Sequence, residues 1–456
     1  MMNNVSDTIT AIATAPGEGA IAIVRVSGPQ SMTIADAIFR GKGPPPSQRD
    51  AGTFLHGRII SHDETADEVL LLIYRAPRSY TREDSIEIQG HGGSAAARRI
   101  LRCVLDAGAR MAEPGEFTKR AFLNGRIDLL QAEAVLDLIR SRSDRAAASA
   151  LEQLEGGLSH AFDAVYDHLL AVAADIEATL DFSEDELPSH LMSTISARLD
   201  SVESDLKGLL FTWDEGHVLR DGALIVIGGK PNVGKSTLLN QLLGVDRAIV
   251  NRMPGTTRDS IEEQIVINGY LVRLVDTAGL RPTDCEIEVE GIRRARQYVQ
   301  KADILVYMVD GSRWMDDEDV ACLKEKSDEK IVLVVNKSDL GLCESNRSYM
   351  TKVTHVSCSL LAGNDVGRIR NVIAEKLSKL HVGQQRSVIS ERHRRLLVMA
   401  LKDVAEAGLL INRSESDPAL ASSRLRAALE TLGEVTGRVY HDELLNSIFS
   451  RFCIGK

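Results

Sequence analysis

The glycine-rich segment Gly229–Ser236 carries the clearest chemistry in this sequence. It follows the apolar run Leu224–Ile227 and precedes a segment with helical character, Thr237–Leu243. A strand, a glycine-rich turn and a helix start are typical of a phosphate-binding loop, in which backbone N–H groups and the helix N-terminus surround phosphate oxygens. We therefore expect Lys235 to contact the β- and γ-phosphates and the Ser236 hydroxyl to bind Mg²⁺.

A second motif, Asn336–Asp339, predicts the base. It follows the apolar run Ile331–Val335. The Asp339 carboxylate can accept hydrogen bonds from the N1–H and the 2-amino group of guanine, whereas adenine would leave it desolvated and unpaired. A polar site of this kind can discriminate by about 10⁴–10⁵. The sequence therefore favours GTP over ATP.

Two further motifs fit the same site. Asp276–Gly279 follows the apolar run Val272–Val275; Asp276 would hold Mg²⁺ through water, and the Gly279 N–H would sense the γ-phosphate. Upstream, Gly255–Asp259 supplies Thr257 to Mg²⁺ in the triphosphate state. Four unrelated loops in this order would require four coincidences, so we predict a GTP-binding domain. The residues expected at GTP are Asn232, Val233, Gly234, Lys235, Ser236, Thr237, Asn251, Thr256, Thr257, Asp276, Thr277, Ala278, Gly279, Asn336, Lys337, Asp339, Ser357, Cys358 and Ser359.

The bulk properties predict a cytoplasmic protein. Apolar runs such as Ile304–Val309 are far shorter than the roughly 20 residues that cross a bilayer, and Met1–Thr10 has no signal-peptide core. The six cysteines are scattered without paired spacing, which indicates neither a zinc site nor a disulfide framework and fits a reducing compartment.

The net charge of −11 argues against a protein that coats nucleic acid by charge alone, although local patches can still bind RNA. Arg98, Arg99 and Arg102 form one candidate patch, and Arg392 with Arg394 and Arg395 forms another. For both, a solvated helix face is the favoured interpretation.

The pattern of elements divides the chain into parts of different class. Up to about residue 120 it is mixed, with strands expected at Ala20–Val26 and Val69–Tyr74 and a helix at Ser94–Leu105. From about residue 126 to 210, apolar residues recur at helical spacing, beginning with a stripe of Leu129, Ala132, Leu136 and Ile139. Asp128 with Gln131 resembles a capping box. Strands return only at Ala223.

Helices resume after about residue 380 with two apolar stripes, and each would stay uncovered if its helix stood alone. Packing them against the helices of 126–210 makes the GTP-binding part an insertion. We therefore predict a multidomain α/β plus all-α protein, in which a Ras-like P-loop GTPase domain is inserted into a helical domain behind an N-terminal α+β domain. The expected boundaries are 1–120 for the α+β domain, 121–217 and 381–456 for the two parts of the helical domain, and 218–380 for the GTPase domain.

Three further stretches carry a family resemblance. They are Pro114–Thr118 with Ala121–Asn124, the turn Gln89–Gly93, and the segment Phe452–Lys456. Together with the GTP motifs they resemble the MnmE (TrmE) family of tRNA-modification GTPases. The resemblance implies a homodimer that acts on tRNA with the flavoenzyme MnmG (GidA). The pair would add an aminomethyl or carboxymethylaminomethyl group to C5 of the wobble uridine (U34).

The resemblance also implies how GTP would be hydrolysed. Small GTPases orient water with a glutamine where this chain has Leu280, so another group and another positive charge are needed. The Asn232 side chain, with the backbone carbonyls of Asn251, Met253 and Thr256, matches the family's K⁺ site; a loop-stabilising asparagine is the alternative. Glu288 matches the water-orienting glutamate, although it also fits an exposed acidic run. Arg258 and Asp259 belong to the same switch, which dimerisation of the GTPase domains would order.

The N-terminal part matches a folate site. Arg25, Glu87, Arg126 and Lys456 match positions that bind a 5-formyl- or methylene-tetrahydrofolate-type cofactor, although the third position is usually lysine. Surface or strand-pairing roles are the alternative for each. Cys453, in the matching terminal segment, is expected near the one-carbon chemistry, against the alternative of a stray reduced cysteine.

Hypotheses of different classes remain open at this point. The favoured one is an enzyme, a K⁺-dependent GTPase that drives tRNA modification. The alternative is a GTP-gated docking module whose partner carries all the modification chemistry. A ribosome-assembly GTPase is less consistent, because residues 380–456 lack the Gly-x-x-Gly loop of its usual RNA-binding module.

Overall fold

A computed structural model describes residues 7–61, 64–181, 190–246, 262–276, 293, 297–324, 326–351, 353–362, 365–379, 389–412 and 417–456. The chain divides into two compact units, one made of Met1–Leu136 with Leu432–Lys456 and the other of Asp137–Thr431.

The first unit is built on a seven-stranded sheet. Its strands are β1 (Ile9–Ile12), β2 (Ile21–Ser27), β3 (Phe39–Gly41), β4 (Phe54–Ser61), β5 (Glu64–Tyr74), β6 (Ser85–His91) and β7 (Arg110–Met111). They lie in the order β3-β4-β5-β6-β2-β1-β7. Neighbours are antiparallel except for β1 and β7, which are parallel.

The two faces of this sheet have different roles. Helices α1 (Ser31–Ile38) and α2 (Ser94–Asp106) contribute to an apolar core with the strands. Because side chains alternate along a strand, Val24 and Val26 of β2 enter this core and Arg25 lies on the opposite face. The arginines of α2 are on its exposed side, as expected for a solvated helix face. A short 3₁₀ helix, η1 (Pro46–Gln48), follows β3.

Two segments that carry the family resemblance meet in this unit. Helix α3 (Glu116–Leu123) follows Gly115, and α15 (Asp442–Phe449) precedes the terminal segment. Gly115 has φ of 70°, and a Cβ there would lie 2.6 Å from the Phe449 carbonyl oxygen. Its N–H donates to the Cys453 carbonyl oxygen at 3.4 Å. Gly115 thus allows the C-terminal segment to approach the start of α3 closely.

Helix α4 (Leu129–Arg140) begins at the predicted capping box. The Asp128 N–H donates to Gln131 Oε1 at 3.0 Å, and the Gln131 N–H donates to Asp128 Oδ1 at 2.8 Å. This reciprocal pair satisfies two N–H groups of the first turn, which confirms the prediction. The predicted apolar stripe is buried at Leu129 but fails at its last position, because Ile139 is 41% exposed in the final turn of α4.

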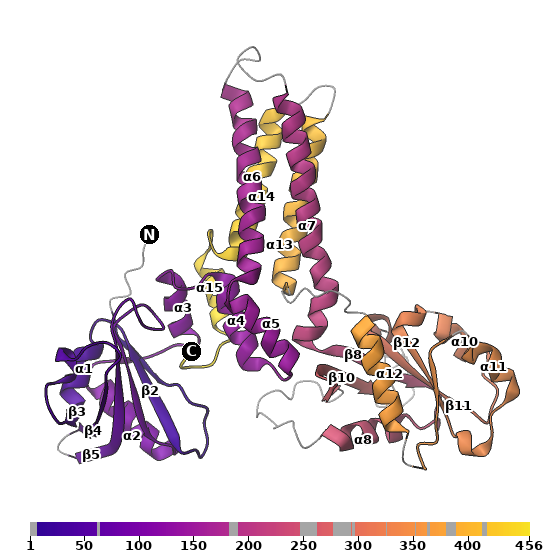
Figure 1. The fold of residues 1–456 in the computed structure, drawn as a ribbon, viewed down its shortest axis with the longest axis horizontal. Helices are drawn as coiled ribbons and strands as arrows, with labels where there is room; N and C mark the ends of the chain where they lie inside the picture. Colours follow the sequence, from indigo (N-terminus) through magenta and orange to yellow (C-terminus); the bar gives the residue numbers. More distant parts are fainter. Residues whose placement is uncertain are drawn as a thin grey trace. The chain divides into compact units, whose positions relative to one another are not determined.

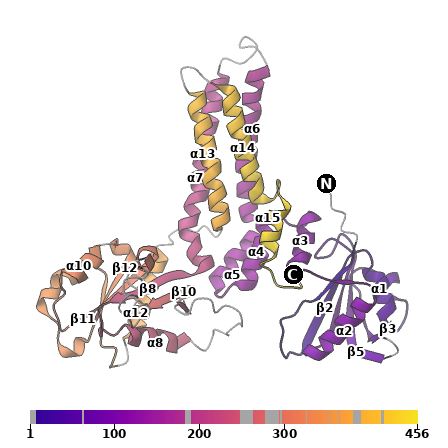
Figure 2. The same cartoon turned by 180° about the vertical axis from the view of Figure 1, so that it is seen from behind.

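The second unit contains a bundle of long helices. These are α6 (Gly157–Asp181), α7 (Leu191–Asp221), α13 (Glu391–Ile411) and α14 (Pro418–Thr436), with the shorter α5 (Asp144–Leu154) beside α6. Figures 1 and 2 show the four long helices side by side. Leu169, Val172 and Ile176 of α6 are fully buried, and Glu177 pairs with Arg426 of α14. Helix α7 packs against both α6 and α13, so helices from before and after the inserted part pack together, as predicted.

Between α7 and α13 the chain forms a six-stranded sheet with helices. Its strands are β8 (Ala223–Gly229), β9 (Glu262–Ile267), β10 (Tyr270–Asp276), β11 (Ile304–Asp310), β12 (Ile331–Asn336) and β13 (His355–Ser357). They lie in the order β13-β12-β11-β8-β10-β9, and all pairs are parallel except β9 with β10. The helices are α8 (Lys235–Asp246), α10 (Asp317–Lys324), η4 (Asp328–Lys330), η5 (Ser338–Leu340), η6 (Glu344–Asn346), α11 (Arg347–Met350) and α12 (Val366–Lys379).

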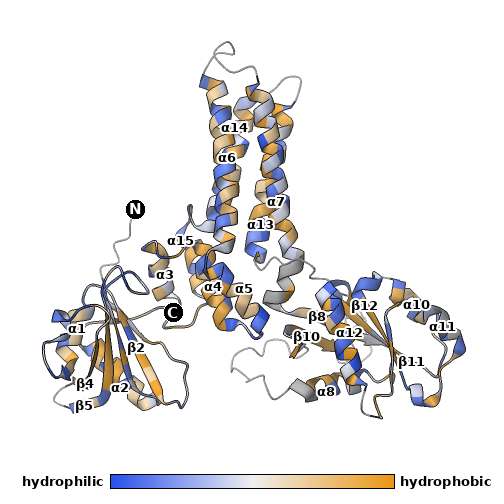
Figure 3. Ribbon diagram, in the orientation of Figure 1, coloured by the Kyte–Doolittle hydropathy of each residue, from blue (hydrophilic) through white to orange (hydrophobic). Residues whose placement is uncertain are grey.

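The central strands β8, β11 and β12 are buried along nearly their whole length and are hydrophobic up to their carboxyl ends (Figure 3). Such strands belong in a parallel sheet that is covered on both faces. The predicted fold class is confirmed: a P-loop GTPase domain inserted into a helical domain, behind an α+β domain. Among the helices that the structure describes, none has the length and apolarity to cross a bilayer.

Candidate functional site

The phosphate loop joins β8 to α8 and holds Lys235 in place. Lys235 is buried, and its Nζ donates to the Gly229 carbonyl oxygen at 2.8 Å and to the Lys230 carbonyl oxygen at 2.7 Å. These bonds hold the ammonium group across the loop, at the N-terminus of α8. This arrangement offers both a fixed charge and helix N–H groups to phosphate oxygens.

Two hard oxygen donors lie side by side next to this loop. The Ser236 hydroxyl at the start of α8 donates to Asp276 Oδ2 at 3.2 Å. Asp276 ends β10, which pairs with β8 in parallel, so the two motifs leave the same edge of the sheet. A hydroxyl and a carboxylate suit Mg²⁺, which prefers oxygen ligands and retains several waters. The residues present therefore fit the expected metal ion.

Asn336 ties the base motif to the phosphate loop. Its buried amide donates to the Val233 carbonyl oxygen at 2.8 Å and accepts from the Leu360 N–H at 3.1 Å. Cys358 is buried beside it, and burial raises the pKa of this thiol to about 11, so it stays protonated. Asn336 and Cys358 thus contact the nucleotide-binding loops themselves.

The remaining base-site residues surround the same strand ends. Lys337 has φ of 62°, and its Nζ donates to Asp310 Oδ2 at 2.7 Å. Burial raises the pKa of Asp310, but hydrogen bonds from Lys337 and Ser312 outweigh it, so the net pKa lies below the usual value. Asp339, in η5, is exposed. The Ser359 N–H donates to Asp365 Oδ2 at 3.0 Å.

Asn232 lies in the phosphate loop with a left-handed backbone, φ of 63°. With Lys230, Asp310, Lys337 and neighbouring residues it lines a cavity of about 250 Å³. The other expected K⁺ ligands and the switch residues fall outside the described residues. They are Asn251, Met253, Thr256, Thr257, Arg258, Asp259, Thr277, Ala278, Gly279 and Glu288.

A second site lies in the first unit, on the face of the sheet that carries Arg25. Arg25 and Glu87 are direct cross-strand partners, and Nε and Nη2 of Arg25 donate to Glu87 Oε1 at 2.9 and 2.7 Å. Arg25 and Glu87 therefore do pair across neighbouring strands, which was the alternative to a ligand-binding role. Nη1 of Arg25 also reaches the Gly455 carbonyl oxygen at 3.5 Å, which brings the terminal segment to the pair.

All three predicted cations of this site surround one aromatic ring that sequence reasoning missed. The guanidinium carbons of Arg126 and Arg25 lie 4.6 and 5.2 Å from the ring centroid of Tyr80, and Lys456 Nζ lies 5.8 Å from it. The Tyr80 hydroxyl is bonded to the Thr118 hydroxyl at 2.9 Å. Nothing in the local sequence distinguishes Tyr80 from an ordinary core aromatic residue.

The charge balance of this cluster suits an anionic ligand. Arg25, Arg126 and Lys456 face the single carboxylate of Glu87 among the predicted residues. Burial lowers the pKa of Lys456, and repulsion from Arg25 lowers it further. An anion with carboxylate groups would relieve this repulsion, and guanidinium groups bind carboxylates well. The side chains therefore suit a ligand that carries carboxylate groups.

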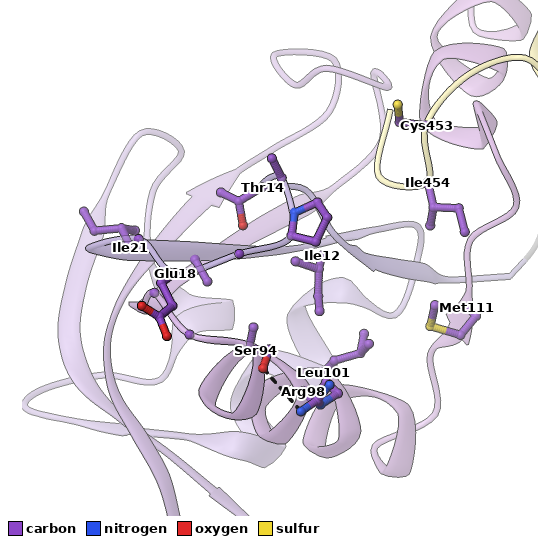
Figure 4. Close-up of a pocket in the computed structure, with 18 residues that line it drawn as sticks. Ile12, Thr14, Glu18, Ile21, Ser94, Arg98, Leu101, Met111, Cys453 and Ile454 are labelled. Carbon is purple, nitrogen blue, oxygen red and sulfur yellow. Dashed lines mark hydrogen bonds between the residues drawn. The ribbon is translucent and has the colours of Figure 1, made fainter. Parts of the chain in front are cut away.

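Cys453 lies beside a different cavity of the same unit. This cavity, of about 660 Å³, is lined by the β1–β2 loop, by α2 and by Cys453 with Ile454. Figure 4 shows Ile454 pointing toward the cavity and the Cys453 sulfur pointing away from it. The chain then passes β1 at Gly455, and Lys456 reaches Tyr80. The role expected for Cys453 stays a prediction.

Comparison with known proteins places the whole chain in one family. Residues 8–126 match the model of the GTP-binding protein TrmE N-terminus, and residues 129–453 match that of the MnmE helical domain. The chain is 43% identical to a protein of Geobacter metallireducens, over 99% of each. It is 42% identical to a protein of Syntrophotalea carbinolica, over 99% of each chain. It is 39% identical to a protein of Clostridioides difficile, over 99% of this chain and 100% of that protein. Each of these relatives is named tRNA modification GTPase MnmE. The chain therefore belongs to the MnmE family of tRNA modification GTPases.

Proposed function

We propose that this GTPase acts with a flavoprotein of the MnmG (GidA) family to modify the wobble uridine of certain tRNAs. The product would carry an aminomethyl or carboxymethylaminomethyl group at C5 of U34. The names of its relatives support an action on tRNA, and the resemblance of its terminal segment supports this particular reaction.

The observation that carries the proposal is the cation cluster around Tyr80 in a chain that also has a GTP site. A GTPase that only gates docking needs no second anion site. Here Glu87 would accept donors from a pterin, while Arg126 and Lys456 would meet carboxylates of a folate tail. The folate, when bound, would supply a one-carbon unit.

Hydrolysis would be centred on the phosphate loop. Lys235 would bind phosphate oxygens, Ser236 and Asp276 would hold Mg²⁺, and Asp339 would accept from guanine. Asn232 would contribute an oxygen to K⁺, an ion that would offset negative charge on the phosphates. Glu288 would orient the attacking water. Dimerisation of the GTPase domains would order Arg258 and Asp259. The chain itself would work as a homodimer in the cytoplasm.

The experiment is mass spectrometry of total tRNA from cells that lack this protein. Modified wobble uridine should disappear and return with the wild-type gene, but not with Lys235→Ala or Arg25→Ala. A matched control, Lys379→Met on the exposed face of α12, should restore it fully. Normal modification in cells that lack the protein would refute the proposal.

A Glu288→Ala variant distinguishes this proposal from the docking alternative. If it binds GTP, fails to hydrolyse it and still supports modification, then the GTP cycle only regulates docking. Loss of modification in this variant would support the enzyme.

A further inference from the structure

Lys230, the second residue of the phosphate loop, is tied by its side chain to the start of α10. Its Nζ lies 3.1 Å from Asp319 Oδ2 and also pairs with Asp316. The Lys230 side chain is 36% exposed, whereas that of Asp319 is only 6% exposed. The lysine therefore reaches from the loop onto a carboxylate that is held inside the domain.

Asp319 is fixed from several directions. Its Oδ1 accepts a hydrogen bond from the Tyr307 hydroxyl at 2.9 Å, and its Oδ2 accepts from the Asp316 N–H at 3.2 Å. In return, Asp316 Oδ1 accepts from the Asp319 N–H at 3.1 Å, so the two aspartates form a reciprocal cap of α10. Burial raises the pKa of Tyr307, and the neighbouring Asp319 raises it further, so the phenol remains a neutral donor. A buried carboxylate with these partners has little freedom to move.

The same network reaches the residue expected to bind phosphate. The Lys230 carbonyl oxygen accepts a hydrogen bond of 2.7 Å from Lys235 Nζ. On the other side, Tyr307 of β11 lies in register with Gly228 of β8, one residue before the loop begins. Lys230 thus links two contacts: α10 holds its side chain, and its carbonyl holds Lys235.

We propose that Asp319 is a positioning residue of the nucleotide site: with Tyr307 it anchors Lys230, and through Lys230 it sets the first turn of the phosphate loop and the carbonyls that hold Lys235. The inference rests on the proposed function, which assigns phosphate binding to Gly229–Ser236. A loop that is already ordered loses less conformational freedom when it binds, so this anchor should strengthen nucleotide affinity. The contribution is to binding, because the network contacts the loop backbone and none of the residues expected to act in hydrolysis other than Lys235.

The test uses the full-length chain and two readouts, the Kd for fluorescent methylanthraniloyl-GDP and steady-state GTP hydrolysis. Lys230→Met and Asp319→Asn should each raise Kd and KM by about fivefold. Because both act through one contact, the Kd of the double variant should not exceed that of the weaker-binding single variant. The kcat at saturating GTP should stay within about twofold, as expected when uniform binding is lost. Lys230→Arg should restore the affinity, because it keeps the charge. Lys379→Met, which removes an exposed pair with Glu375, should change nothing.

The outcomes separate the inference from the proposed function. A wild-type chain that does not bind the fluorescent GDP would overturn both. Binding by the wild type with unchanged Kd in Lys230→Met, or additive losses in the double variant, would overturn the positioning role alone. If Asp319→Asn does not fold, the Kd values of Lys230→Met and Lys230→Arg still test the positioning role. Both variants should fold, because the Lys230 side chain is 36% exposed.

Discussion

The side-chain amide of Asn336 donates a hydrogen bond of 2.8 Å to the carbonyl oxygen of Val233. One residue of the guanine motif therefore supports the phosphate loop, 103 positions earlier in the chain. Its amide oxygen accepts from the Leu360 N–H, so the loops for phosphate and base are joined through one buried side chain. The binding of both the phosphates and the base should therefore depend on Asn336.

Asn336→Ala should weaken binding of GDP and GTP by at least about tenfold, because it leaves a buried carbonyl and a buried N–H unpaired at a cost of about 1–3 kcal/mol each. Nucleotide titration with the fluorescent analogue measures the change. Asn346→Ala is the matched control: this asparagine is also buried and bonded to backbone, yet it supports Met315 and Arg313. It should lower stability with a smaller effect on affinity. Equal losses of affinity in both variants would contradict the specific role of Asn336.

GTP turnover should rise strongly when K⁺ replaces Na⁺, and Asn232→Ala should abolish the difference. The reason is that a side-chain oxygen in the phosphate loop is a suitable ligand for a hard cation close to the phosphates. Phosphate release in the two salts at equal ionic strength measures it. Equal rates of the wild type in both salts would remove the cation mechanism.

Tyr80→Ala should weaken binding of 5-formyltetrahydrofolate, because three cations lose the ring against which they are placed, at about 0.5–2 kcal/mol each. Tyr80→Phe keeps the ring and should bind nearly as the wild type does. Isothermal titration calorimetry compares the two. Equal affinity of the alanine variant and the wild type would show that the cluster serves another ligand.

Gly455→Ala should reduce tRNA modification and leave GTP hydrolysis unchanged. Gly455 has φ of 98°, and a Cβ there would lie 2.6 Å from the Ile12 carbonyl oxygen, so the terminal segment must shift away from β1. Lys456 would then leave Tyr80. Mass spectrometry of modified uridine and a phosphate-release assay on the same variant test both halves. Full modification with Gly455→Ala would argue against a function of the segment.

Acid should destabilise the first unit through Glu116. Burial raises the pKa of this carboxyl, but hydrogen bonds from Arg110, the Glu113 N–H and Arg120 outweigh it, so the net pKa lies below its usual 4.5. A group with a lowered pKa stabilises the fold above its unfolded value, and this stability is lost as the pH falls through the folded value. The melting temperature should therefore drop as the pH falls below about 4.5.

Glu116→Gln tests this assignment, because it removes the titrating group at a cost of about 3 kcal/mol for a broken buried pair. The variant should melt earlier at neutral pH and depend less on pH in acid. Glu113→Gln, three residues away and exposed, is the control and should follow the wild type. Identical pH profiles for all three proteins would show that other carboxyls govern acid unfolding.

Local patterns predicted the elements well. The apolar runs before the GTP motifs became β8, β10 and β12, and the cap at Asp128 and Gln131 was visible as two residues at a spacing of three. These features depend on neighbours in sequence. The register that puts Arg25 opposite Glu87 does not, and it appears only when β2 and β6 pair.

Contacts between distant segments could not be predicted in the same way. Tyr80 and Asp319 have no distinctive local sequence, and each acquires its partners only through folding. Gly115 is informative in retrospect, because the glycine in Pro114–Thr118 leaves room for Phe449 and Phe452, more than 300 positions away along the printed sequence. The motif alone predicts a tight turn at Gly115. It does not predict which distant residues pack against this glycine.

The bond between Arg25 and Gly455 joins residues 430 positions apart. During synthesis at about 5–20 residues per second, Arg126 leaves the ribosome about 15–70 s before Lys456. For that interval the nascent domain holds Arg25, Glu87 and Arg126 without Lys456. The cation cluster around Tyr80 is thus completed only after the GTPase domain has been made.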